Sequence, residues 1–317
     1  MGGDASFAES DFAIELATGA TVVSVLVSGA SIYRHLVHYS CPDQQRYIIR
    51  LLFTCPLYAV TSLLSLRVSG QAVYFETIRD CYESLVIYSF MVLILEYAGG
   101  EGNCVAKMQG RPALVLPAPC CCLEPRPRTV ELMRECKRGT LQFVVLKPLV
   151  GVLSCIMASQ GKLYDVVYQT LMLTVYNVSY TVALFYLLVF YLATKEAAAR
   201  FNPVSKFAAV KIVVFATYYQ SIVIRCLPGM GTEAAERLGD LILCLEMIAF
   251  SLVLGCAFDI GPYHMGNEVA AAPGGRAKLV LTNASNVFTA RDVVQDAIHN
   301  FTPAYQDYVL QVRHSAR

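Results

Sequence analysis

The sequence predicts an all-α membrane protein with seven transmembrane helices, its N-terminus outside and its C-terminus in the cytosol. Three observations lead to this fold class: the composition, the number of long apolar stretches and the placement of the basic residues. Hydrophobic residues make up 56% of the 317 residues, charged residues only 15%, and the mean hydropathy is +0.50. Soluble domains carry about a quarter charged residues, so this composition indicates an integral membrane protein.

Seven stretches are long and apolar enough to cross a bilayer as helices, which takes about 20 residues each. Residues 1–11 hold three acids and no Lys or Arg, so the first stretch is expected to be an uncleaved spanning helix behind an extracellular N-terminus. Pro56 in the second stretch and Pro148 in the fourth can kink their helices, which would suit static packing as well as a gate. The predicted transmembrane domain covers residues 12–260, and its spans are residues 12–32, 47–66, 73–97, 140–157, 166–192, 207–225 and 238–258.

The basic residues give the orientation. The connections after the first, third and fifth spans, together with the C-terminal tail, hold 17 of the 25 Lys and Arg residues. The N-terminus and the other three connections, with Arg225 counted in the last, hold 4. Cytoplasmic segments carry the excess of Lys and Arg, so the first group is predicted to lie in the cytosol.

Two cytosolic segments carry further features. The loop of residues 98–139 contains three adjacent cysteines, and juxtamembrane cysteines are candidates for S-palmitoylation; the alternative is plain reduced thiols in a loop. In the tail, residues 261–317, the first part up to 282 is rich in Gly, Ala and Pro and is expected to be irregular, and residues 290–302 predict a short amphipathic helix. The candidate lipidation sites are Cys120, Cys121 and Cys122.

Charged residues inside the spans mark the candidate functional site, because each costs about 2.5 to 3.5 kcal/mol at the centre of a bilayer. The third span places three acids at i, i+4 and i+7 on one helical face, and Arg79 can reach the first and last of them. Two readings remain open: structural ion pairs between helices, or a polar cavity for a substrate or ion near the midplane. The candidate residues are Glu76, Arg79, Asp80, Glu83, Lys147, Asn177, Lys211 and Glu246.

Several classes of function are disfavoured. The net charge of +1 provides no field that would attract nucleic acid. The histidines and cysteines show no ligand spacing for a metal, and no cofactor is implied. Motifs of hydrolases, kinases and zinc enzymes are absent from the sequence, so the chain is not expected to be an enzyme.

Six separate segments resemble one known family. They read RDCYESLVIYSF, EYAGGE, QFVVLKPLVG, YNVSYTVALFYLLVFYLAT, FNPVSKFAAVKIVVF and CLEMIAF, at residues 79–90, 96–101, 142–151, 176–194, 201–215 and 244–250. Through them the chain resembles the organic solute transporter alpha and transmembrane protein 184 family. The tail segment DVVQDAIHNFTPAYQDY, residues 292–308, is similar to the transmembrane protein 184 branch in particular.

The resemblance implies seven spans, an outside N-terminus and a cysteine-rich cytosolic loop. It implies facilitated diffusion of amphipathic organic anions, such as steroid or bile-acid conjugates, together with a single-span beta-type subunit. A homo-oligomer is the alternative assembly, and a lipid is the alternative substrate. The implied location is the plasma membrane or an endosomal or vacuolar membrane of a eukaryote. Gly255 and Cys256 stand where relatives tend to carry a basic pair, and the tail ends soon after Tyr308, which leaves partner contacts at the cytosolic face open.

The first hypothesis is therefore a facilitative transporter of amphipathic organic solutes that uses the polar residues of the spans. The alternative is a non-transporting seven-span receptor or a scaffold for membrane trafficking or signalling. A G-protein-coupled receptor is a weaker third, because no Asp-Arg-Tyr ends the third span and no Asn-Pro-x-x-Tyr ends the seventh.

Overall fold

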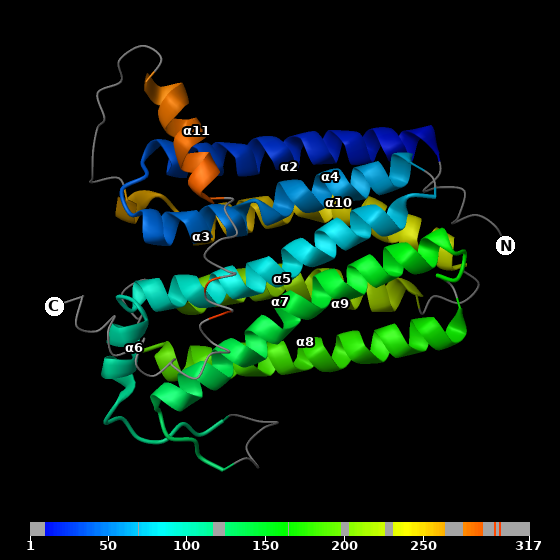
Figure 1. Ribbon diagram of the computed structural model, residues 1–317. Helices are drawn as coiled ribbons and strands as arrows, with labels where there is room; N and C mark the ends of the chain where they lie inside the picture. The colour runs from blue at the N-terminus through cyan, green and yellow to red at the C-terminus, as the bar shows by residue number, and fades with distance from the viewer. Residues whose placement is uncertain are drawn as a thin grey trace.

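Long helices make up most of the protein, and they lie side by side along one common direction (Figure 1). Within the described residues no strand is present, and the β-type pairing is an isolated antiparallel bridge between Leu114 and Arg126. The all-α prediction is therefore confirmed for this part of the chain. The computed structural model describes residues 10–68, 70–116, 124–163, 165–197, 203–225, 231–263 and 275–287, with Gln295 and Ile298.

The first span is the 27-residue helix α2 (Asp11–Val37), five residues longer at its C-terminal end than predicted. The Ser10 side chain accepts a hydrogen bond from the Ala13 N–H at 3.2 Å and so caps the helix. A buried face of small side chains packs on α4 and α10, which lets the backbones approach closely. These small residues are Ala13, Ala17, Ala20, Thr21, Ser24 and Ser28.

The second span consists of two helices, α3 (Pro42–Leu52) and α4 (Thr54–Arg67), with a break at Phe53. Pro56 follows the break and has no backbone N–H, so the carbonyl of Leu52 lacks the donor that a continuous helix would provide. The helix is therefore interrupted next to Pro56. Together the two helices form one candidate span of 26 residues.

The third predicted span is α5 (Ala72–Tyr97), and it leads into the short helix α6 (Glu101–Met108). Gly99 and Gly100 join them with φ angles of 93° and 87°, a backbone region that glycine enters without steric cost. The two helices are bent by 68°. The bend turns the chain sideways at the end of the bundle.

The fourth and fifth spans are α7 (Val130–Ser159) and α8 (Val166–Thr194). α7 begins ten residues before the predicted stretch, and it runs through Pro148 without a break. The Asp165 side chain accepts hydrogen bonds from the N–H groups of Val167 and Tyr168, and so caps α8.

The remaining helices are α9 (Pro203–Arg225), α10 (Thr232–Ala257), the 3-10 turn Gly261–Tyr263 and α11 (Gly275–Val287). The expectation that residues 261–282 are irregular was wrong for their last part, because α11 covers it. Its apolar residues pack against α2 and α3, and this packing cannot be read from the local sequence. The helix predicted at 290–302 lies outside the described residues except for Gln295 and Ile298.

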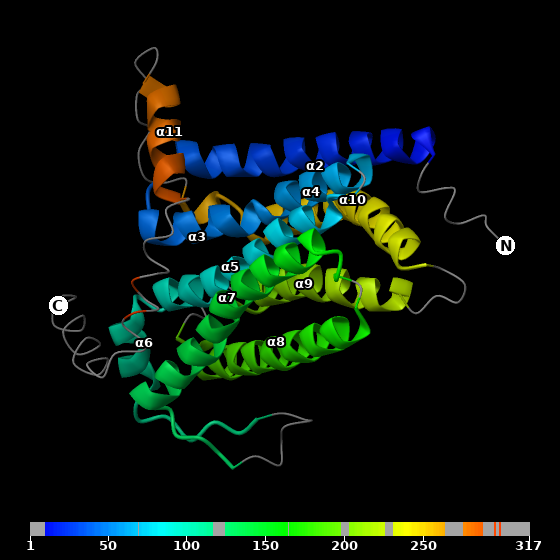
Figure 2. The same ribbon diagram turned by 45° about the vertical axis from the view of Figure 1, so that its right-hand side comes forward.

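α5 holds a central place in the bundle. It packs on α3 and α4 along one side and on α7 along another, while α2, α4 and α10 pack on one another, α9 packs mainly on α10, and α8 mainly on α7. Figures 1 and 2 show α5 between these groups and α11 crossing the ends of α2 and α3. The core along α5 is well packed, since Phe90, Met91 and Leu93 are fully buried.

The outward faces of the long helices are apolar. Leu149 and Val152 on α7 and Leu171 and Leu173 on α8 are all exposed, as expected of side chains that face lipid. By length and composition, five spans qualify among the described residues, and a sixth does so if α5 and α6 count as one bent span. The five are Asp11–Val37, Pro42–Arg67, Val130–Ser159, Val166–Thr194 and Ala234–Ala257.

Candidate functional site

Charged side chains gather in two clusters along α5. The Arg79 cluster (Arg79, Glu76, Asp240 and Ser62) faces α4 and α10, and the Lys147 cluster (Lys147, Asp80, Glu83 and Tyr176) faces α7 and α8. Each cluster offers two carboxylates to one cation. The Lys147 cluster lies near the middle of α5 and of α7, and the Arg79 cluster lies nearer the start of α5 and of α10; charged groups inside a span are costly unless they are paired.

In the Arg79 cluster, one guanidinium joins three helices. Nη1 of Arg79 donates to Oδ1 of Asp240 at 2.9 Å and to Oγ of Ser62 at 2.7 Å. The Glu76 carboxylate is farther away, with Oε1 at 3.9 Å from Nη2. The side chain of Asp240 is 4% exposed, so this pair holds α5 to α10 with little access for solvent.

In the Lys147 cluster, one ammonium group from α7 is shared by two acids of α5. Nζ of Lys147 lies 3.0 Å from Oδ1 of Asp80 and 3.4 Å from Oε2 of Glu83. The two acids differ in exposure: the side chain of Glu83 is 8% exposed and that of Asp80 is 47% exposed. Lys147 itself is 2% exposed. The cluster is therefore closed around Glu83 and open on the side of Asp80.

Aromatic rings cover the other sides of this cation. Nζ of Lys147 lies 3.8 Å from the ring centroid of Tyr176 and 5.6 Å from that of Phe143, within the range of cation–π attraction. The Tyr176 hydroxyl donates to Oε2 of Glu83 at 3.5 Å. Tyr176 and Tyr180 stack at 5.8 Å, and Phe143 lies 5.6 Å from Tyr180. The ammonium thus stands between two carboxylates and a continuous aromatic surface.

Two glycines on α7 allow the close helix packing that builds this site. A Cβ atom at Gly139 would overlap the ring of Tyr186 on α8, and one at Gly151 would lie 2.5 Å from Cγ2 of Thr77 on α5. Lys147 lies between these glycines. Small residues at such contacts let helix backbones approach in a membrane, and here they bring α7 close to both α5 and α8.

The structure brings five of the predicted site residues together, although in two groups. Arg79 contacts Glu76 as expected, yet its main partner is Asp240, and Glu83 pairs with Lys147 instead. The three acids of the predicted face also differ in environment, since only Glu83 is buried. The five are Glu76, Arg79, Asp80, Glu83 and Lys147.

The other predicted residues lie elsewhere. The Asn177 side chain donates to the Leu173 carbonyl one turn earlier at 2.7 Å. Oε2 of Glu246 is buried and has no hydrogen-bond partner among the described residues. Lys211 lies in α9, but its side chain is outside the described part, as are Cys120, Cys121 and Cys122.

Three members of the two charged clusters were not predicted from the sequence: Asp240, Ser62 and Tyr176. Asp240 is an acid within the predicted seventh span, so a complete list of charges in the spans would have included it. Ser62 and Tyr176 give no such signal, because hydroxyl groups are common in spanning helices. Their roles depend on which helices are neighbours.

The Lys147 cluster sets one ammonium group against two carboxylates, so it carries a formal charge of −1 when both acids are ionised. Its ammonium group is the only formal positive charge of the cluster, and one of its two carboxylate partners is accessible. Within the described residues, no group of three or more His, Cys, Asp or Glu side chains is placed to hold a metal ion.

A family model described as "Organic solute transporter Ostalpha" matches residues 13–263, from the first turn of α2 to the turn after α10. The chain belongs to the organic solute transporter Ostalpha family. The match includes both charged clusters. No solved structure matches the chain.

Membership of the Ostalpha family confirms the resemblance at the level of the family. Together with the apolar helices, it makes the chain an integral membrane protein of a transporter family. The Ostalpha family is one of transporters and not of enzymes, which is consistent with the expectation from the missing enzyme motifs.

Proposed function

We propose that this Ostalpha-family chain is a facilitative transporter of amphipathic organic anions of the steroid or bile-acid type. One observation carries the proposal: Lys147 shares its charge between Glu83, which is buried, and Asp80, which is half exposed. An incoming anion can take the place of Asp80 at the ammonium group without leaving a buried charge unpaired, and a buried unpaired charge is strongly disfavoured.

The aromatic rings beside Lys147 are consistent with an amphipathic substrate. Phe143, Tyr176 and Tyr180 give a broad apolar surface next to the cation. An anion with a flat apolar body would match both parts, since its charge meets the ammonium group and its body meets the rings. A small inorganic anion would use only the first of these contacts.

One observation favours the second candidate, a non-transporting receptor or a scaffold for trafficking or signalling. Glu83 and Lys147 are both buried and paired, and Arg79 joins α4, α5 and α10. Such pairs are also expected in a helix bundle whose buried charges only stabilise the packing of its helices. The two functions differ in whether flux depends on Lys147 beyond its effect on folding.

We further propose the seven-span topology, with residues 1–11 outside, a domain of residues 12–260 and a cytosolic tail of 261–317. The 23-residue helix α9 serves as one span, and α5 as another. In support, α6 and α11 lie at the end of the bundle opposite the start of α2 (Figure 1), and the connections predicted for that side, together with the tail, hold 17 of the 25 Lys and Arg residues.

The finer assignments are proposals that rest on the sequence. They are membership of the transmembrane protein 184 branch, a single-span beta-type subunit or a second copy of the chain as partner, and a plasma or endosomal or vacuolar membrane. Acylation of Cys120, Cys121 and Cys122 in the loop of residues 98–139 belongs with them.

The experiment is a flux assay in proteoliposomes with a labelled steroid conjugate, with and without a candidate single-span partner. Lys147→Met should abolish flux when it is compared with the wild type at equal amounts of folded protein. Lys137→Met is the matched control, because Lys137 is another buried lysine of α7, 3% exposed and paired with Glu101 at 2.7 Å. Equal loss in both variants at equal protein level would assign Lys147 a structural role only.

A further inference from the structure

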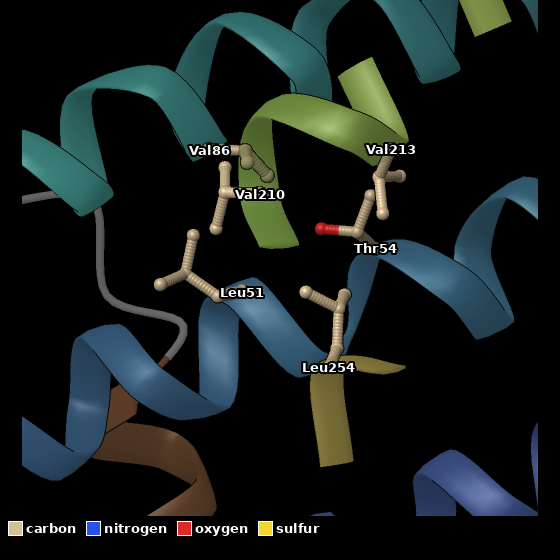
Figure 3. A pocket seen from close by; sticks show the side chains of 6 residues that line it. All are labelled: Leu51, Thr54, Val86, Val210, Val213 and Leu254. Carbon is tan, nitrogen blue, oxygen red and sulfur yellow. The ribbon is translucent and has the colours of Figure 1, made fainter. Parts of the chain in front are cut away.

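The break in the second span lies next to a small pocket. Thr54, the first residue of α4, is 2% exposed, and its hydroxyl has no hydrogen-bond partner among the described residues. The hydroxyl points into a pocket of about 10 Å³ (Figure 3). Its walls come from α3, α4, α5, α9 and α10, and consist of Leu51, Thr54, Val86, Val210, Val213 and Leu254.

The lining of this pocket is too apolar to hold an ordered water molecule. Five of the six side chains are aliphatic, whereas a stable buried water needs two to four polar partners. The pocket is therefore free space beside a helix break. Pro56 removes a backbone hydrogen bond at the same place, so the joint between α3 and α4 lacks a constraint that a continuous helix would have.

A buried side chain of α3 close to this joint bonds to α11. Arg50, three residues before Phe53, is 2% exposed, and its Nε donates to the carbonyl oxygen of Val287 at 2.7 Å. Val287 is the last residue of α11. A cation at the carbonyl end of a helix satisfies free acceptors and the helix dipole.

Further contacts dock α11 across the ends of α2 and α3. The Asn283 side chain donates to the Leu36 carbonyl at 3.0 Å. Val287 is fully buried in an apolar cluster with Leu36 and Ile49. Figure 2 shows α11 standing across these helix ends, so both helices are held by one segment of the tail.

The same arginine links the tail to the charged site. The backbone carbonyl of Arg50 accepts a hydrogen bond from the Tyr82 hydroxyl of α5 at 2.7 Å. Tyr82 directly precedes Glu83 of the Lys147 cluster. A movement of α3 thus acts on α5 at the position next to that cluster.

We propose that α11 is a latch on the broken second span. When docked, α11 holds α3 in line with α4 through Arg50, while Asn283 fixes α11 to the end of α2. When it leaves, α3 pivots at Phe53 toward the pocket beside Thr54, and the bundle opens at the end where α11 lies. The part of this inference that concerns flux rests on the proposed transport function.

Hydrogen–deuterium exchange of the full-length protein in proteoliposomes tests the latch without any assay of transport. Arg50→Gln should speed exchange about tenfold in residues 275–287, the factor expected for the loss of one hydrogen bond to a charged group. Exchange should also rise in residues 42–53 of α3. Arg46→Gln is the control, because Arg46 lies one turn earlier on α3 and pairs with Asp43 of the same helix.

Asn283→Ala is a second test variant if Arg50→Gln fails to fold, since it removes the hydrogen bond from α11 to the Leu36 carbonyl. Leu281→Ala is its control, because Leu281 is exposed on α11. Faster exchange in α11 with unchanged exchange in α3 would overturn the latch and leave α11 a passively docked helix. Unchanged exchange in α11 in both variants would overturn the role of Arg50 and Asn283.

Flux is measured on the same variants. A rise of a few-fold in Asn283→Ala, and none in Leu281→Ala, is the expected result. A fall at equal protein level would contradict a latch that holds the bundle shut. If neither the wild type nor any variant shows flux, the proposed transport function fails, and the exchange results still decide whether α11 restrains α3.

Discussion

Arg79 and Asp240 form an ion pair with 2.9 Å between Nη1 and Oδ1, and this pair fastens α5 to α10. The same nitrogen donates to Ser62 of α4. Inside a bilayer no water replaces a lost partner, so all three helices depend on one guanidinium group. The Arg79 cluster thus fastens three helices, whereas the Lys147 cluster contains the most exposed carboxylate of the two clusters, Asp80 at 47% against 32% for Glu76.

Replacement of Asp240 by Asn should destabilise the protein strongly. The change leaves the guanidinium of Arg79 without its nearest carboxylate, and removal of one partner of a buried pair costs about 3 to 5 kcal/mol. Thermal unfolding in detergent, followed by size-exclusion chromatography, measures the loss. The double variant Arg79→Met with Asp240→Leu should regain much of the stability, and a double variant as unstable as Asp240→Asn would contradict the pairing.

The glycines of α7 should tolerate no added methyl group. Gly151→Ala places a Cβ 2.5 Å from Cγ2 of Thr77, and overpacking of this kind costs about 1 to 3 kcal/mol. The second change Thr77→Ser removes that Cγ2 and should restore thermal stability. Gly29→Ala on α2 is the control, because no atom lies within 4 Å of its added Cβ; a loss as large in the control would exclude packing as the cause.

Much of the helical pattern was predictable, because the length and apolarity of a spanning segment are local properties of the chain. The third and fifth predicted spans, residues 73–97 and 166–192, agree closely with α5 and α8. The break near Pro56 was also predictable, since proline removes a backbone donor wherever it occurs. By contrast, α11 has a weakly apolar sequence, and its apolar residues find their surface only on α2 and α3.

The candidate site was predictable in its residue types and only partly in its pairs. Spacing along one helix showed that Arg79 can reach Glu76, but the pairing of Lys147 with Glu83 and of Arg79 with Asp240 joins residues far apart in the chain. Such pairs depend on which helices are neighbours. The exposure of Asp80, which separates it from Glu83, depends on the same packing.

Replacement of Pro56 by Ala should stiffen the second span. Alanine supplies the N–H that the Leu52 carbonyl lacks, and it is the residue most favourable to helix. Exchange of the backbone amides around Phe53 should slow, and flux should fall if the joint moves during transport. Pro148→Ala is the control for amide exchange, because α7 runs through Pro148 without a break; exchange around Phe53 that slows equally in Pro148→Ala would show that Pro56 is not the cause.

Loss of charge should affect stability little at Asp80 and more strongly at Glu83. Asp80→Asn removes a half-exposed partner of Lys147, so stability should change by less than about 1 kcal/mol. With one competitor fewer at the ammonium group, the half-saturating concentration of an organic anion should fall several-fold. Glu83→Gln removes the buried partner, which also accepts from Tyr176, and should cost about 1 to 3 kcal/mol. Unfolding and saturation curves for both variants measure this contrast, and an unchanged half-saturating concentration in a folded Asp80→Asn protein would mean that the anion does not compete for Lys147.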